Sequence, residues 1–213
     1  MITPNRLILA LECALLFFLL PVLLYLHPTR LNVHICLWLV AAYAAFILHK
    51  TPGFSWRKEW NGTPWKPRDL KLVAARFLLS TLGIILLTRI IQPERLFSFP
   101  MNRPGFWLVV MILYPILSAL PQELIFRSFF FRRYAPLFPG NWIKLTSSAL
   151  IFGFIHIVFH NPISPLLSVL CGFFLASSYR EHGSLKRVAL EHALYGDMVF
   201  TIGLGLYFLV HTS

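Results

Sequence analysis

Seven apolar stretches, each close to the ~20 residues that a bilayer core requires, constrain the fold of this chain more than any other feature. They lie at about 7–26, 33–49, 72–92, 105–131, 142–160, 163–179 and 188–210. A helix satisfies all its backbone hydrogen bonds within one such segment, which an irregular segment cannot do in lipid. We therefore predict an all-α, polytopic transmembrane helical bundle of about seven spans, within a range of six to eight.

The composition agrees with a membrane protein and excludes a soluble globule. Of the 213 residues, 57% are hydrophobic and 13% are charged. We expect one transmembrane domain over 1–213, with N-terminal accessory spans in 1–104 and the catalytic core spans in 105–210. The formal charge is +11, but the basic residues stand between apolar runs and form no stripe on a polar domain. Nucleic acid is therefore not an expected partner.

The distribution of these basic residues predicts the orientation in the membrane. Six lie in the connection 50–71, and three lie in each of 132–144 and 180–187. The opposite set of connections holds only Arg30, Arg95 and Arg103. Because cytoplasmic connections are enriched in Lys and Arg, we expect a cytoplasmic N-terminus and a C-terminus outside. The expected location is the inner (plasma) membrane of a bacterium.

The segment from Pro121 to Arg127 places a carboxylate and a guanidinium inside an apolar run. Ionisable groups at membrane depth are costly and usually functional. Glu123 and Arg127 are four residues apart, so they share a face if the segment is helical. Pro121 predicts a kink or a break beside the acid. From the spacing alone, a plain ion pair at the cytoplasmic boundary is also compatible with this pattern.

Further ionisable groups lie in the second half of the chain. His156 and His160 have the spacing of metal-binding histidines on a helix, but Ile157 stands where the HExxH motif has glutamate. Glu191, His192 and Asp197 lie near the start of the last span. A carboxylate with histidines at membrane depth can activate a water, bind a metal or relay protons.

The helical segments that carry Glu123, His156 and His192 would not place these residues at the same depth in the membrane if they were straight. Along straight helices, Glu123, His156 and His192 would stand at different depths below the basic ends of their spans. We predict that helix tilts and the Pro121 kink bring the three side chains together around one water.

Three short motifs occur in a fixed order: Glu123-x-x-x-Arg127, Phe152-x-x-x-His156, and His192. In order and spacing they resemble the CPBP family of intramembrane proteases, also called the CAAX-protease and bacteriocin-processing family. The resemblance covers about residues 105–200. It implies a helical membrane enzyme of the glutamic type, formerly described as zinc-dependent. In such an enzyme a glutamate activates water for peptide-bond hydrolysis, helped by two histidines and usually an asparagine.

The resemblance assigns roles residue by residue, with two departures. Glu123 and Arg127 match the last glutamate and the arginine of EExxxR, His156 matches FxxxH, and His192 matches the first position of HxxxN. The first glutamate of EExxxR is Gln122 here, and the asparagine position is Gly196. Asp197, Tyr195 or a backbone amide could replace the missing amide. Supporting roles are expected for Gln122, His160, Glu191, Gly196 and Asp197.

These observations favour an intramembrane endopeptidase that cleaves a membrane-anchored protein or peptide near the cytoplasmic half of the bilayer. Glu123 is the expected base, oriented by Arg127, and His156 and His192 position the water and the oxyanion. No cofactor is required, but a divalent metal such as zinc would take Glu123, His156 and His192 as ligands. The alternatives are a catalytically inactive, peptide-binding relative and a small transporter or proton relay. The substrate and the oligomeric state are left open.

Overall fold

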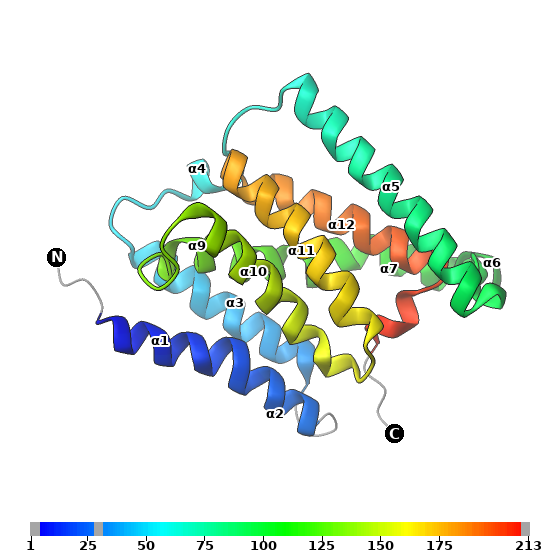
Figure 1. Ribbon diagram of the computed structural model, residues 1–213, viewed down its shortest axis with the longest axis horizontal. Helices are drawn as coiled ribbons and strands as arrows, with labels where there is room; N and C mark the ends of the chain where they lie inside the picture. Colours follow the sequence, from blue (N-terminus) through cyan, green and yellow to red (C-terminus); the bar gives the residue numbers. More distant parts are fainter. Residues whose placement is uncertain (1–4, 28–31, 210–213) are drawn as a thin grey trace.

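The computed structural model describes residues 5–27 and 32–209, and within these ranges it is helical without any strand (Figure 1). This confirms the predicted all-α bundle. The first half contains α1 (Arg6–Ala14), α2 (Leu20–Leu26), α3 (Val33–Lys50), α4 (Trp56–Asn61), α5 (Pro67–Ile91) and α6 (Ser98–Asn102). The second half contains α7 (Pro104–Tyr114), α8 (Leu120–Glu123), α9 (Phe130–Arg133), α10 (Asn141–Ile155), α11 (Ile163–His182) and α12 (Leu185–Ile202).

The starts of several helices follow directly from their sequence. The side chains of Asn5, Asn32 and Ser184 accept hydrogen bonds from backbone N–H groups in the first turns of α1, α3 and α12. Such caps satisfy donors that have no partner within the helix. Pro67 and Pro104 occupy the first positions of α5 and α7, where the missing N–H of proline costs nothing.

Six helical runs of the described chain are long and apolar enough to cross a membrane. They are Arg6–Leu26, Val33–Lys50, Pro67–Ile91, Pro104–Arg133, Asn141–Phe159 and Ile163–His182. Each corresponds to a predicted span, and the number lies at the lower end of the predicted range. The chain is an integral membrane protein.

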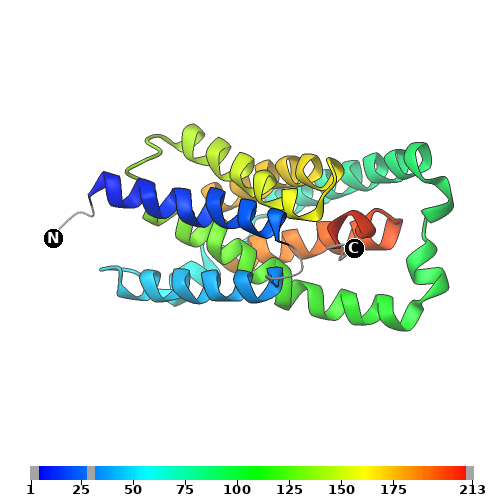
Figure 2. The ribbon, with the colours of Figure 1, turned by 90° about the horizontal axis from the view of Figure 1, so that it is seen from below.

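The seventh predicted segment, 188–210, is helical but its predicted bounds were wrong. Helix α12 begins at Leu185 and ends at Ile202. Gly203 ends it with φ 133°, and a Cβ there would overlap the backbone carbonyl of Arg95. A 3₁₀ turn, Gly205–Phe208, follows, and residue 210 lies outside the described residues. Figure 2 shows α12 (orange) in the middle of the bundle. The side chains of Arg187, Glu191 and His192 on this helix are buried within the protein.

The run Pro104–Arg133 crosses the bundle as one helix of 30 residues. Two π-helical turns interrupt its α-helical hydrogen bonding, at Pro115–Ala119 and at Leu124–Phe129. The first of these wider turns directly precedes Pro121 and leaves room for its ring, which would clash with the carbonyl of Leu117 in a regular α-helix. The span continues past Pro121, and its regular α-helical hydrogen bonding is interrupted on both sides of Glu123 by the two π turns and not by a break in the helix.

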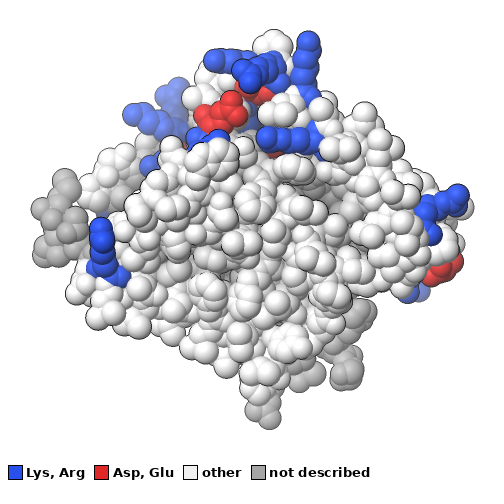
Figure 3. Space-filling view, viewed as in Figure 1, with Lys and Arg blue, Asp and Glu red and all other residues white. Residues whose placement is uncertain are grey.

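Most of the charged side chains visible in Figure 3 lie at the top of the view, and smaller groups lie at its left and right edges. The buried Glu59 and the half-buried Glu12 tie helices together. Glu59 of α4 accepts hydrogen bonds from Arg132 at 2.6 Å and from Tyr179 at 2.5 Å. Glu12, the one acid of the first span, pairs with Arg133 at 2.7 Å. These contacts place α4 and α1 against α9.

Helices α10 and α11 pack closely through small residues. Ala149 and Gly153 on α10 face Gly172 and Val169 on α11. A Cβ at Gly172 would lie 3.1 Å from the backbone of Ala149, and a Cβ at Gly153 would overlap the side chain of Val169. Small residues at such spacing let membrane helices approach each other. This contact fixes the end of α10, where His156 lies.

We predict that Gly153→Val lowers the free energy of unfolding by about 1–3 kcal/mol, because the added methyl groups force α10 and α11 apart. The measurement is a thermal or detergent-denaturation curve of the purified protein. Gly83→Val in α5 is the control, since a Cβ at Gly83 meets nothing within 4 Å. Equal losses in the two variants would contradict the proposed close contact.

Candidate active site

A fully buried ion pair lies at the centre of the site. Arg127 Nε lies 3.1 Å from Glu123 Oε2, and the side chains of both residues have no exposed area. The two residues are four apart, so the i, i+4 pairing expected from the sequence is present. Removing two charges from water is costly, and their close contact offsets this cost only if the remaining polar atoms find partners.

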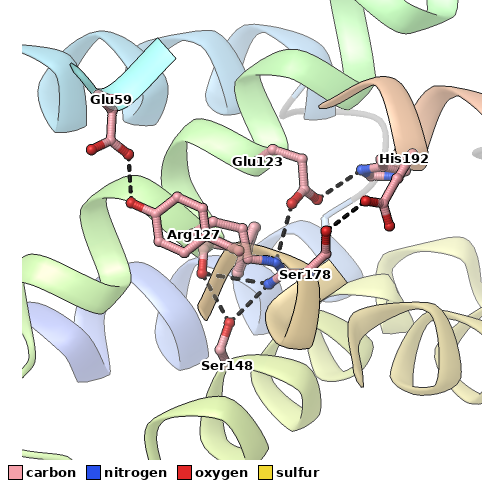
Figure 4. A network of polar contacts seen from close by, with 9 residues as sticks. Glu59, Glu123, Arg127, Ser148, Ser178 and His192 are labelled. Carbon is pink, nitrogen blue, oxygen red and sulfur yellow. Dashed lines mark hydrogen bonds and ion pairs between the residues drawn. The ribbon is translucent and has the colours of Figure 1, made fainter. Parts of the chain in front are cut away.

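The other carboxylate oxygen of Glu123 contacts a histidine. His192 Nδ1 lies 2.9 Å from Glu123 Oε1, and Figure 4 shows Glu123 between Arg127 and His192. An acceptor-only carboxylate makes Nδ1 the protonated nitrogen, which leaves Nε2 of the neutral ring with its lone pair. Glu123 therefore fixes both the tautomer and the orientation of His192.

Arg127 is held by α10 as well as by Glu123. Its Nη1 donates to Ser148 Oγ at 2.8 Å, and Ser148 Oγ donates to the carbonyl of Phe126 at 2.9 Å. The guanidinium also lies over the ring of Phe152, 5.0 Å from its centre. The cation is thus fixed on three sides, and it holds the carboxylate in turn.

His156 begins the 3₁₀ turn His156–Phe159 that follows α10. Its Nδ1 donates to the carbonyl of Phe152 at 2.6 Å, so Nε2 is again the nitrogen with a free lone pair. The ring of Phe152 contacts both imidazoles, with ring centres 4.8 Å from His156 and 5.4 Å from His192. The two histidines therefore share one aromatic neighbour in the site.

Both histidines line a large cavity of about 1060 Å³. Its walls are mostly apolar and come from α2, α3, α7, α10 and α12, and its polar lining includes Gln122 and Tyr114. The lining reaches the α2–α3 and α6–α7 connections, at Asn32 and Arg103, and thus the end of the bundle opposite the basic connections. Cleavage near the cytoplasmic half of the bilayer stays a prediction.

Glu123 does not belong to the cavity wall, whereas Gln122 does. The Gln122 amide donates to Ser118 at 2.7 Å, and its Oε1 has no hydrogen-bond partner within the described chain. A molecule in the cavity therefore contacts His192, His156 and Gln122. Glu123 acts on it only indirectly, through its hydrogen bond with His192.

The donor atoms of Glu123, His156 and His192 do not fit a common metal site. Within the described parts of the chain, three such groups come within 4.8 Å of one another only at Asp69, Glu181 and His182. The carboxylate of Glu123 already faces a ring N–H and a guanidinium. At Asp69, Arg187 Nη2 lies 3.5 Å from the carboxylate and supplies the positive charge.

Three of the remaining predicted site residues, His160, Glu191 and Asp197, lie outside the cavity wall. His160 is exposed and stacks on Tyr25, with ring centres 4.2 Å apart. Glu191 turns toward α11, where Ser178 donates to it. Asp197 is half-buried, and neither it nor Glu191 is part of the cavity wall. Gly196 does line the cavity, beside His192.

Sequence reasoning missed one residue of the site, Tyr114. Its ring lies directly against Gly196, where a Cβ would overlap the aromatic carbons and the hydroxyl oxygen. The ring centre is also 6.0 Å from that of His192. Only the absence of a side chain at position 196 hinted that another residue fills this space.

Comparison with known proteins agrees with the motif pattern. Residues 104–196 match the model of the type II CAAX prenyl endopeptidase Rce1-like family. This segment belongs to the CPBP, or CAAX protease, family. The match contains Glu123, Arg127, His156 and His192, whose individual roles stay predictions. No curated protein and no solved structure gives a significant match.

Within the CAAX protease segment, the two departures from the family pattern both face the cavity. Gln122 has an amide where the motif has its first glutamate. The ring of Tyr114 occupies the space that a side chain at Gly196 would fill. The family match over residues 104–196 supports a membrane protease as the general function. How the site could carry out hydrolysis depends on the residues at these two positions, Gln122 and Gly196.

We predict that Arg127→Met lowers the free energy of unfolding by about 3–5 kcal/mol, because it leaves the buried Glu123 carboxylate without its cation. Detergent titration followed by fluorescence measures the change. Ser148→Ala, which removes one hydrogen bond to the same guanidinium, is expected to cost about 1 kcal/mol.

The double variant Glu123→Gln with Arg127→Met should recover at least half of the loss, since no net charge stays buried at this point. A double variant as unstable as Arg127→Met alone would contradict the ion pair as the source of the effect.

Proposed function

We propose that this protein is an intramembrane endopeptidase that hydrolyses a peptide bond of a membrane-anchored protein or peptide. The observation that supports this most is the contact between the Glu123 carboxylate and Nδ1 of a histidine that lines the cavity. A buried carboxylate that orients an imidazole is the arrangement by which a histidine becomes a general base.

In this proposal Glu123 activates the water through His192. The water lies in the cavity and gives a proton to His192 Nε2 while its oxygen attacks the carbonyl carbon of the scissile bond. The negative charge of Glu123 stabilises the imidazolium that forms, and Arg127 keeps the carboxylate in place. When the C–N bond breaks, His192 returns the proton to the leaving amine. The water is consumed and the base is regenerated.

His156 has a different part in the proposed reaction. Its Nδ1–H is used by the carbonyl of Phe152, so its Nε2 is available as an acceptor for the second proton of the water. Two acceptors aim the water's lone pair away from both rings and toward the substrate. No step is assigned to a metal, and we expect dialysis against a chelator to leave the rate unchanged.

The proposed surroundings follow from the charge distribution. The basic end of the bundle would face the cytoplasm of a bacterium, with the N-terminus on the same side and the protein in the inner membrane. The partners are a lipid-embedded peptide segment and the bilayer itself. A mostly apolar cavity suits a substrate that brings an apolar chain to the site.

We predict that the protein in liposomes cleaves a quenched fluorescent peptide that carries a farnesylated cysteine near its C-terminus. Glu123→Gln and His192→Ala should each lower kcat by about 10²-fold or more, the usual contribution of a general base. Fluorescence gives the rate, and mass spectrometry gives the cleaved bond.

Glu191→Gln is the matched control for this experiment. It removes a buried carboxylate next to His192 in the sequence, but one that faces Ser178 and lies outside the cavity wall. Its rate should stay within about threefold of the wild type, well below the effect of a lost base. Equal cleavage by the wild type and Glu123→Gln would overturn the proposal.

A second candidate function is a non-hydrolytic relative that binds membrane peptides. It is favoured by the amide of Gln122, which takes the cavity-facing position next to an enclosed Glu123. A peptide could then bind beside His192 without being cleaved.

The variant Gln122→Glu distinguishes the two functions. If the site is a binding site only, we expect wild-type protein to be inactive and Gln122→Glu to acquire cleavage, because a carboxylate on the cavity wall can activate water directly. If His192 is already the base, we expect the wild type to cleave and Gln122→Glu to change kcat by less than about tenfold. The same peptide assay measures both.

A further inference from the structure

We infer that the hydroxyl of Tyr114 donates the hydrogen bond that stabilises the tetrahedral oxyanion, an inference that rests on the proposed hydrolytic function. The family pattern places a side-chain amide one helical turn after His192, and this chain has Gly196 there. The structure fills the same space with a phenol from another helix.

The position of Tyr114 is set by two local features. It is the last residue of α7 and directly precedes the π turn Pro115–Ala119. Its ring then rests on the backbone of α12 at Gly196, because a side chain there would overlap the ring and the hydroxyl. Glycine at 196 and tyrosine at 114 are thus parts of one contact.

The ring is also held from the side. Phe200, one turn after Gly196, packs edge-on against it with ring centres 5.5 Å apart. On the other side the ring of His192 lies at 6.0 Å, with an angle of 78° between the planes. Tyr114 therefore stands next to the proposed base, on the same cavity wall, in a fixed orientation.

The hydroxyl of Tyr114 is free to donate. Two buried tyrosines use their hydroxyls within the protein: Tyr134 donates to Glu12 at 2.9 Å and Tyr179 donates to Glu59 at 2.5 Å. For Tyr114 no hydrogen-bond partner occurs in the described chain, and its residue borders the cavity. A polar group in such a place is satisfied by what the cavity contains.

The chemistry needs such a donor. When water attacks the scissile carbonyl, the π electrons move to the carbonyl oxygen and give it a negative charge. His156 and His192 each use their Nδ1–H inside the protein, so neither neutral ring has a further N–H to offer. The phenol O–H can donate to the oxyanion without transferring its proton. Collapse of the intermediate restores the C=O bond as the amine leaves.

Tyr195 does not compete for this role, although it is near in sequence. Its ring packs between α5 and α11, against Phe77 and Phe174 with ring centres 6.2 and 6.1 Å away. Its hydroxyl also lacks a hydrogen-bond partner in the described residues. Tyr195 also borders the cavity, but its hydroxyl oxygen is buried within the protein. Tyr195→Phe therefore removes an enclosed hydroxyl from the same wall, and it serves as the control.

We predict that Tyr114→Phe lowers kcat for the farnesylated peptide by about 10–10²-fold and changes KM by less than about twofold, because the hydroxyl acts only on the transition state. Tyr195→Phe should keep kcat within about twofold. The ring stays in place in both variants, so thermal unfolding should be unchanged. Equal kcat in the wild type and Tyr114→Phe would overturn the inference while the proposed hydrolysis stands.

A binding measurement separates this inference from the proposed function. A phosphinate in place of the scissile amide mimics the tetrahedral oxyanion, and its affinity is compared with that of the uncleavable N-methyl amide. Tyr114→Phe should weaken the binding of the phosphinate by about 10–10²-fold and leave the affinity for the N-methyl amide unchanged.

If the wild type shows this difference in affinity but cleaves no peptide, Tyr114 is supported as the hydrogen-bond donor and the proposed hydrolytic function is overturned. Equal phosphinate affinity in the wild type and Tyr114→Phe would overturn the donor.

Discussion

The structure depends on keeping the charges of Glu123 and Arg127 together inside a bilayer-spanning bundle. Neither residue has any exposed area, so each must be satisfied by the protein alone. The carboxylate is shared between Arg127 and His192, and the guanidinium is shared between Glu123, Ser148 and the face of Phe152. These partners come from α10 and α12, which the ion pair thereby joins to the long run Pro104–Arg133. A membrane helix with uncompensated charges would not settle in this position.

The two ends of the bundle differ: one is packed tightly, and the other contains the cavity. At the basic end, Glu59 and Glu12 tie α4 and α1 to α9, and the small residues of α10 and α11 allow close approach. At the other end, the helices diverge around a cavity whose wall carries the two imidazoles. The polar chemistry is thus enclosed by rigid contacts on one side and open to a ligand on the other. Rigid support on one side is what keeps catalytic groups at fixed distances.

Much of this arrangement could be predicted from the sequence, because apolar run length and i, i+4 spacing act locally. The helical runs, the Glu123–Arg127 pair and the family of residues 104–196 follow from such local patterns. Three features could not be predicted. The enclosure of Glu123 depends on helix rotation after a π turn, the burial of α12 depends on its neighbours, and Tyr114 contacts Gly196, which lies 82 positions later in the sequence. Long-range contacts of this kind leave no mark on periodicity.

The two π turns that flank Glu123 have a consequence for how such a site can change over time. Each π turn holds one residue more than a regular turn, so the loss of one residue within it is absorbed when the turn becomes a regular α turn. The side chains on either side then keep nearly the same faces, and the helix shortens by only ~1.5 Å. In a regular helix the same deletion would rotate everything beyond it by about 100°. The segment around Glu123 can therefore lose a residue at either π turn while the groups that face the cavity stay in place.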